Sequence, residues 1–417
     1  MTKIEERLNL FDGFLLFIFL LVFNISAGFP DNPIVMASRW LVCGILTSFS
    51  FFYAAIYNNF KIKILPKPFF FLVFPLLVQC LWDLDIIEIT FTRSLSFLFY
   101  CTAIYFFLNR EKESPTYIRK IYNFFCAVTG LFIFLSNLSF IGNYSINGDF
   151  IGFYPNRNMT VSLLISGLLL FSNFLLSLNF KLKKIMLIFY ITIMTYMIFI
   201  THSRMALICY AIIVLYFSLF IHSHKNTIRN IIIIILIPFV IAGIPAIGEI
   251  FDIESINRIF IQSSYDDSTG LGRDVWDIGL ALISERPFIG WGANSAYYHT
   301  FVASTSRWGW GVHNSYLIML IEGGLIGTIF YVSFFINIFY RCWISYRRSI
   351  QIMTPNEKIF IKICLLNCIV LLINGMSESF LFSAGNAMSL PFWFSLLTMY
   401  AYLEKKKDEV LRKGLIK

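Results

Sequence analysis

Long runs of hydrophobic residues, separated by short polar stretches, are the dominant pattern of this sequence. A helix needs roughly 17–25 mostly apolar residues to cross a bilayer, and the sequence contains about 12 such runs. They cover residues 11–29, 34–57, 66–82, 89–108, 121–141, 159–179, 185–201, 205–222, 228–247, 314–340, 359–376 and 387–403. The pattern predicts an all-α polytopic membrane protein with about 12 transmembrane helices.

Composition agrees with a membrane protein. Of the 417 residues, 58% are hydrophobic and 14% are charged, and the mean hydropathy is +0.73. Soluble domains carry about 25% charged residues, so a chain of soluble domains is excluded. The formal net charge of +9 would suggest nucleic-acid binding in a soluble protein. Here it reports topology instead, because basic residues collect in cytoplasmic loops, and no nucleic-acid partner is expected.

The loops between the runs alternate in their content of basic residues. The first set of loops holds roughly 25 of the 33 lysines and arginines. This set comprises residues 3–7, 61–67, 110–120, 181–184, 225–229, 341–362 and 405–417. The second set, poor in basic residues, comprises 30–33, 83–88, 142–158, 202–204, 248–313 and 377–386. The positive-inside rule places the first set and both termini in the cytoplasm.

The longest loop divides the chain into three parts. Residues 1–247 form a membrane domain with the first nine helices, and residues 248–313 form a large extracytoplasmic loop. Residues 314–417 hold the last three helices and a basic cytoplasmic tail. Within the loop, a helical stripe made of Trp276, Leu280 and Ile283 lies opposite Arg273. This spacing predicts a short amphipathic helix on the outer leaflet.

The basic residues outside the cytoplasmic loops are all arginines. They are Arg39, Arg93, Arg157, Arg204, Arg258, Arg273, Arg286 and Arg307. Arginine presents a planar fork of donors that binds phosphate through two hydrogen bonds, so the set predicts an anionic ligand on the outer face. Arg39 and Arg93 have a second interpretation, as structural ion pairs with Asp83, Asp85 or Glu88.

His313 is the candidate general base. It precedes a hydrophobic run, and a helix N-terminus favours the uncharged imidazole that a base requires. Glu322 can orient this histidine only if the fold brings the two side chains together. The glycines that follow Glu322 permit close helix packing behind the site. His202 and His299 are the alternative bases.

Four short blocks make the chain resemble a known family. They are Gly152 to Asn158, His202 to Leu207, Gly272-Arg273 with Pro287 to Gly292, and His313 to Leu317 with Glu322 to Gly327. In this order and spacing they resemble the O-antigen polymerase and O-antigen ligase superfamily of bacterial envelope glycosyltransferases. The resemblance covers roughly residues 150–330, and the first 140 residues add only hydropathy.

The resemblance implies a GT-C-like membrane enzyme that moves glycans built on a polyprenyl diphosphate carrier. It implies no cofactor, since the bond to diphosphate is already activated, and no metal. The resemblance implies catalytic roles for Arg204, Arg273 and His313 of this sequence. Substrate-binding roles are expected for Arg157, Asn156, Asn314, Arg286, Arg307 and Glu322.

The same resemblance implies a location and partners. The enzyme is expected in the bacterial inner membrane, with its active site on the periplasmic side. The donor is a polyprenyl-diphosphate-linked oligosaccharide, and the acceptor is a second glycan or lipid A–core. A chain-length regulator and a flippase are the protein partners that such a system suggests, in addition to membrane lipids.

Several alternatives stay open. A polymerase would join lipid-linked repeat units into O-antigen or capsule-like polysaccharide, whereas a ligase would move finished glycan to lipid A–core. A flippase of the same lipid-linked glycan would need charge spread along a path through the bilayer, rather than gathered on one face. Asp83-Leu84-Asp85 has the spacing of a divalent-metal motif, which provides a metal-dependent alternative.

Overall fold

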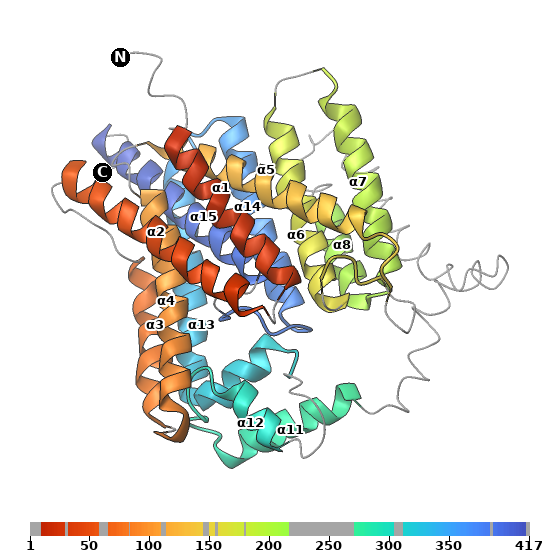
Figure 1. The fold of residues 1–417 in the computed structure, drawn as a ribbon. Coiled ribbons are helices and arrows are strands. Elements are labelled where there is room, and N and C mark those ends of the chain that lie inside the picture. The colour runs from red at the N-terminus through yellow and green to blue at the C-terminus, as the bar shows by residue number, and fades with distance from the viewer. Residues whose placement is uncertain are drawn as a thin grey trace.

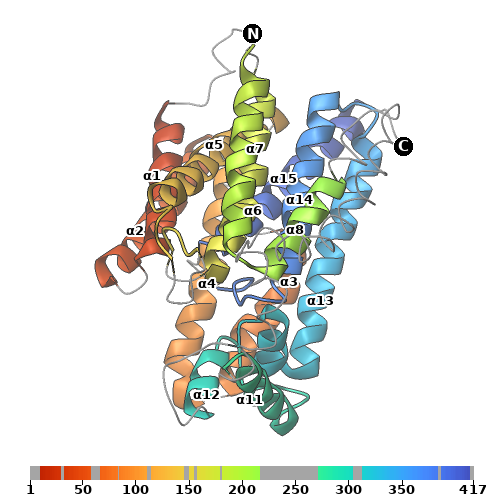
Figure 2. The same cartoon turned by 90° about the vertical axis from the view of Figure 1, so that its right-hand side faces the viewer.

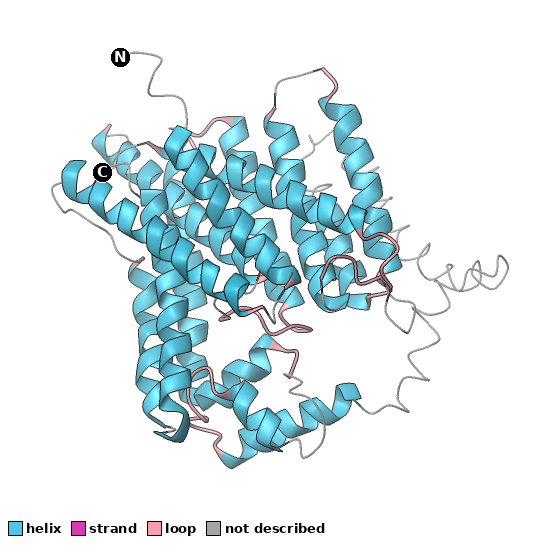
Figure 3. Ribbon diagram, viewed as in Figure 1, coloured by secondary structure: helices cyan, strands magenta, loops and turns pink. Residues whose placement is uncertain are grey.

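The computed structural model describes most of the chain. The described residues are 10–29, 32–57, 66–82, 84–109, 114–144, 150–154, 157–178, 181–216, 271–303, 312–383 and 387–413. Within these ranges the structure is helices joined by loops, with a single isolated bridge between Tyr144 and Phe150 (Figure 3). The hydrophobic run expected at 228–247 lies outside the described residues.

The other expected runs all form helical structure. The helices of the bundle are α1 (Leu10–Gly28), α2 (Pro33–Tyr57), α4 (Ile87–Asn109), α5 (Pro115–Ser139), α6 (Arg157–Ser177), α7 (Lys183–Ile200), α8 (Arg204–Tyr216), α13 (Ser315–Ser349), α14 (Pro355–Asn374) and α15 (Ser389–Arg412). Six stretches in the described part of the chain are long and apolar enough to cross a membrane: 33–53, 84–109, 115–139, 157–177, 183–200 and 315–349. An all-α polytopic membrane protein is therefore confirmed, and the span count of about 12 stays a prediction.

The run at 66–82 departs from a regular helix. It contains η2 (Lys67–Phe69), α3 (Phe70–Val73), the π-helical turn η3 (Phe74–Val78) and η4 (Gln79–Trp82), and a further turn, η5 (Leu84–Ile86), follows it. Proline lacks a backbone N–H and cannot continue the ordinary ladder, and Pro75 lies in the first turn of η3. The sequence pattern gave the position of this segment but not its broken geometry.

Local sequence explains where several helices begin. Thr354 and Glu357 form a reciprocal capping box at the start of α14, next to Pro355. The Ser114 side chain accepts from the Tyr117 backbone N–H at the start of α5. Such caps satisfy amide groups that the first helical turn leaves without partners.

The bundle interior is built around α6 and α15. Trp393 of α15 is fully buried and packs edge-on against Phe69 and Phe97, while Phe394 stacks on Phe125 of α5. Helix α15 packs against α4, α5, α13 and α14, and α14 in turn packs against α6 and α8 (Figures 1 and 2). All eight cysteines are buried and none forms a disulfide, as expected of small packing residues.

The two ends of the bundle differ. The α6–α7 turn, the α13–α14 turn and the end of α15 lie at the upper end in Figure 1, and these are segments rich in basic residues. The starts of α6, α8 and α13 face the lower side. There α11 (Leu271–Glu285) and α12 (Ala296–Ala303) lie beside the ends of α3, α4 and α13 (Figures 1 and 2). This separation agrees with the predicted charge alternation, and the orientation in the membrane stays a prediction.

Helix α11 forms where the amphipathic pattern predicts it, and part of its apolar side packs against the protein. Leu282 is buried with Val312 and Ile321, whereas Trp276 and Leu280 are 44% and 53% exposed. A Cβ atom at Gly279 would lie 3.4–3.6 Å from side-chain atoms of Val312 and Ile321, so this glycine allows α11 to approach closely. Trp276 and Leu280 stay exposed, and the predicted contact of their stripe with the outer leaflet stays a prediction.

Candidate active site

His313 lies on a strained turn just before α13. Its φ angle is +46°, a conformation that residues with side chains adopt rarely. The next residue, Asn314, caps the helix, because its side-chain oxygen accepts from the backbone N–H groups of Tyr316 and Leu317 at 2.9 and 3.1 Å. Local sequence thus fixes both the turn and the helix start, and the backbone strain is of the kind found at functional sites.

The loop that follows α14 is tied to this turn through Ser315. The Ser315 backbone N–H donates to the Gly375 carbonyl at 2.8 Å, and its hydroxyl donates to the Glu378 carbonyl at 2.7 Å. The same hydroxyl accepts from the Phe380 backbone N–H at 3.1 Å. These bonds hold the loop against the start of α13, and they place the Glu378 side chain next to His313.

Glu378 is the carboxylate partner of His313. Nδ1 of His313 lies 3.4 Å from both carboxylate oxygens of Glu378, and Glu378 is only 3% exposed. Sequence reasoning did not single out Glu378, which is separated from His313 by 65 residues. An acidic residue in the basic-poor loop 377–386, directly after a hydrophobic run, was the available signal. The orienting role that the sequence offered to Glu322 is taken by Glu378.

The surroundings of His313 raise its pKa above the usual value. Glu378 raises the pKa of His313, first by a hydrogen bond and also by its negative charge, while burial acts in the opposite direction. The sequence predicted an uncharged imidazole from the nearby helix N-terminus. The Glu378 carboxylate acts against this influence and outweighs the effect of burial, so the imidazole is a stronger base but stays protonated to higher pH.

Helix α13 is interrupted at Gly324, where φ is +55° and ψ is −161°. The loop at residues 287–292 forms hydrogen bonds with backbone groups of α13 before and after this interruption. Trp291 and Gly292 donate to the carbonyls of residues 321 and 322 at 2.9 Å, and the amides of residues 325 and 326 donate back to the carbonyls of residues 287 and 288 at 2.8 and 3.0 Å. The loop therefore satisfies backbone groups that the interruption exposes. The close packing at Gly324 is backbone against backbone, whereas Gly323 and Gly327 lie against the Gln79 side chain.

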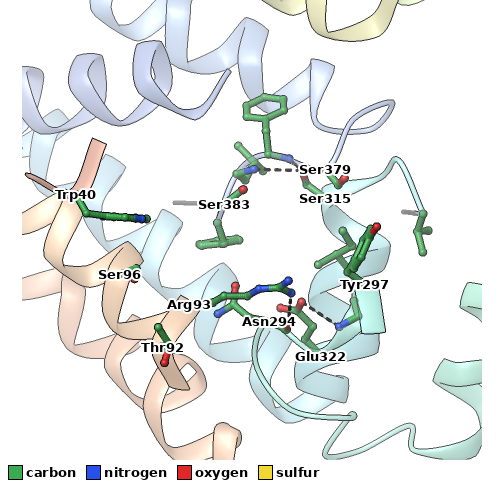
Figure 4. A pocket seen from close by; sticks show the side chains of 16 residues that line it. Trp40, Thr92, Arg93, Ser96, Asn294, Tyr297, Ser315, Glu322, Ser379 and Ser383 are labelled. Carbon is green, nitrogen blue, oxygen red and sulfur yellow. Dashed lines mark hydrogen bonds between the residues drawn. The ribbon is translucent and has the colours of Figure 1, made fainter. Parts of the chain in front are cut away.

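A cavity of about 490 Å³ lies next to the His313 turn, between the bundle and the segments at 271–303. Val312 and Ser315, which flank His313 and Asn314, line it. Arg93 of α4 and the buried Glu322 of α13 are the charged residues among the described lining (Figure 4). Nη1 of Arg93 donates to the Asn294 carbonyl at 3.4 Å, so the guanidinium faces the cavity. The alternative of structural ion pairs for Arg39 and Arg93 stays a prediction, because Asp83 lies outside the described residues.

The remaining predicted arginines occupy several places. Arg204 begins α8 and is exposed, and Arg157 begins α6 and is half-buried. The Arg286 guanidinium stacks on the Trp291 ring, 4.0 Å from its centroid. Arg273 lies in the first turn of α11, where the structure describes the backbone. Asn156, Arg258, Arg307 and Asp83 lie outside the described residues.

Helix α6 is linked to the end of α14, just before the loop that carries Glu378, and the segment before α6 is linked to the end of α7. Asn374, at the end of α14, donates a hydrogen bond to the Ser162 hydroxyl of α6. The amide of Phe150 donates to the carbonyl of Ile200, at the end of α7, at 3.2 Å. Arg157 and Arg204 thus begin helices on the side of the bundle where the His313 turn also lies (Figure 1).

The alternative bases have different surroundings. His202 lies on the α7–α8 turn with φ of +51°. His299 lies on α12, and its ring is 4.4 Å from the Trp291 ring between centroids. Because the Glu378 carboxylate pairs with His313, the geometry favours His313 as the base.

Comparison with known proteins adds one positive finding. Residues 189–332 match a family described as O-antigen ligase. The matched segment runs from α7 to the middle of α13, and so contains Arg204, Arg273, His313 and Glu322. No curated protein gives a significant match. The match supports the O-antigen polymerase and ligase superfamily for this segment of the chain.

Proposed function

We propose that the protein is a membrane glycosyltransferase that polymerises polyprenyl-diphosphate-linked oligosaccharide units into O-antigen or capsule-like polysaccharide on the periplasmic face. The observation that carries this proposal is the pairing of His313 with the buried Glu378, beside a cavity that Arg93 and Glu322 line. A histidine paired with a carboxylate is a general base whose orientation and basicity are set by its partner.

The reaction needs one proton acceptor and one site for the leaving group. Neutral His313 takes the proton of an acceptor sugar hydroxyl as the hydroxyl oxygen bonds to the anomeric carbon of the donor. The bond from that carbon to the diphosphate oxygen breaks, and the polyprenyl diphosphate leaves with the electron pair. Arg204 and Arg273 stabilise the charge that builds up on the diphosphate.

A second candidate is transfer of finished glycan to lipid A–core. It is favoured by the matched family, which is described as O-antigen ligase. The two reactions share the donor, the base and the leaving group, and they differ in the acceptor.

A deletion strain separates these candidates. Lipopolysaccharide of core plus one repeat unit is expected if the protein is a polymerase. Bare core, with polymer retained on the carrier, would identify a ligase instead. Loss of every outward repeat unit would point to a flippase and contradict both transfer reactions.

Arginine-to-lysine variants test the role given to the arginine fork. Arg204→Lys and Arg273→Lys keep the charge but lose the planar pair of donors, so we expect each to reduce transfer by about tenfold or more. Transfer is measured in membrane vesicles at matched expression. Arg348→Lys, at the exposed end of α13, is the control. Full activity in both test variants would remove the bidentate binding of diphosphate from the proposal.

Catalysis is expected to be independent of metal ions, because arginines supply the charge stabilisation that a metal would otherwise provide. Purified enzyme should therefore keep its turnover in EDTA. Loss of turnover in EDTA with recovery in magnesium or manganese would contradict this, and Asp83 with Asp85 would then be the first residues to substitute.

The pH dependence of transfer should report the His313–Glu378 pair. Since only neutral His313 accepts a proton, the rate should rise as pH increases through a pKa above the usual value of 6.5. Glu378→Gln removes the negative partner, so the rising limb should move to lower pH, with a lower plateau. The measurement is the transfer rate between about pH 5 and 9. An unmoved limb would show that Glu378 does not set the pKa of the base.

A further inference from the structure

The cavity beside His313 is lined by two charged side chains of opposite sign, so its net charge is close to zero. Among its described lining residues, Arg93 is the cation and Glu322 is the anion. A diphosphate carries several negative charges, and Glu322 would repel it. An uncharged ligand with many hydroxyl groups meets no such penalty, because hydroxyls donate to a carboxylate and accept from a guanidinium.

Both charged groups make long contacts inside the protein. Nη1 of Arg93 lies 3.4 Å from the Asn294 carbonyl, and Oε1 of Glu322 lies 3.4 Å from the Ala296 backbone nitrogen. Ordinary N–H···O bonds are about 2.9–3.0 Å long, so these two are weak. Glu322 is 6% exposed, and its partners among the described residues are the backbone N–H groups of Asn294 and Ala296. Hydroxyl groups of a ligand would add shorter bonds to both groups.

The remaining walls suit a sugar ring. Figure 4 shows Trp40 and Tyr297 on opposite sides of the Arg93–Glu322 pair, and serines at the upper wall. Aromatic rings offer apolar faces to the C–H groups of a pyranose, and the serine hydroxyls both donate and accept. The volume of about 490 Å³ lies within the range of roughly 300–1,000 Å³ that is usual for ligand pockets.

We propose that this cavity binds the terminal, uncharged sugars of the acceptor glycan, and that Arg93, Glu322 and Tyr297 determine which acceptor is used. The inference rests on the proposed glycosyl transfer and names the substrate of one part of its site. Val312 and Ser315 line the cavity on either side of His313 and Asn314. An acceptor in the cavity would therefore lie next to the base that deprotonates it.

The test measures binding of two separate probes to the purified full-length protein. The first is the repeat-unit oligosaccharide released by mild acid from the lipid-linked pool of the same bacterium. The second is undecaprenyl diphosphate. Tryptophan fluorescence or saturation-transfer NMR reports each affinity. Glu322→Gln and Arg93→Lys should weaken oligosaccharide binding about tenfold or more, because each alters a hydrogen bond to a charged group.

Tyr297→Ala is a further variant that should fold readily, because Tyr297 is 50% exposed. Loss of its ring face should weaken oligosaccharide binding by about three- to tenfold. The controls are Glu88→Gln, Arg348→Lys and Tyr298→Ala, which substitute residues that do not line the cavity. Affinity for undecaprenyl diphosphate should stay within about twofold of wild type in every variant.

The outcomes separate the acceptor site from the proposed function. Unchanged oligosaccharide binding in all three test variants would overturn the acceptor site, even if the wild type transfers glycan. Selective loss of undecaprenyl diphosphate binding would also overturn it and assign the cavity to the donor. If the variants lose oligosaccharide binding but the wild type shows no transfer in vesicles, the sugar site stands and the proposed reaction fails.

Discussion

His313→Ala is expected to lower glycan transfer by ~10²–10⁴-fold while leaving donor binding intact. A sugar hydroxyl is a poor nucleophile near neutral pH, so removal of its proton during bond formation lowers the barrier. His313 is placed for this by the capped turn before α13 and by Glu378, whose oxygens lie 3.4 Å from Nδ1. Transfer and undecaprenyl diphosphate binding are measured separately, at matched expression.

The controls separate lost chemistry from lost structure. His313→Ala leaves Glu378 buried without its imidazole partner, which can itself destabilise the site. His313→Gln retains an amide donor for Glu378 but cannot accept the proton, so it should fold better and remain equally inactive. His202→Ala and His299→Ala should keep most transfer. If His202→Ala abolishes transfer while His313→Ala does not, the base is His202, and loss of donor binding in His313→Ala would make His313 a ligand instead.

Gly324→Ala is expected to lower the free energy of unfolding by ~2–4 kcal/mol and to impair transfer. Its φ of +55° disfavours any side chain, and an added Cβ would lie 2.5–2.6 Å from backbone atoms of Phe288, Ile289 and Gly290. Backbone atoms cannot move aside as a flexible side chain can. The 287–292 loop would have to shift, and with it the Asn294 to Tyr297 wall of the cavity.

Gly44→Ala is the matched control, because a Cβ at this position in α2 would meet nothing within 4 Å. Alanine favours helix over glycine by up to about 1 kcal/mol, so this variant should be unchanged or slightly more stable. Thermal unfolding in detergent compares both variants with wild type. Equal unfolding temperatures for Gly324→Ala and wild type would show that the loop and helix are not packed as described.

Much of this architecture follows from the sequence by itself. Apolar runs in a bilayer become helices, because only helices satisfy the backbone within one segment, so the pattern located α1, α2 and α4 to α8. Asn314 next to His313 marked the start of α13 through a local cap. The position of a candidate base at a helix start was thus predictable from neighbouring residues.

The tertiary structure decided which distant groups meet. Glu378 reaches His313 because Ser315 bonds to the loop after α14, an arrangement that depends on how α13 and α14 pack. Arg93 and Glu322 come together in the lining of a cavity that exists only once α4, α13 and α12 are assembled (Figure 4). The glycines permitted an interruption in α13, but the 287–292 loop, which supplies its hydrogen bonds, comes from elsewhere in the chain. The sequence pattern shows which segments are apolar enough to form membrane helices. Which side chains far apart in the sequence come into contact depends on how the whole bundle packs.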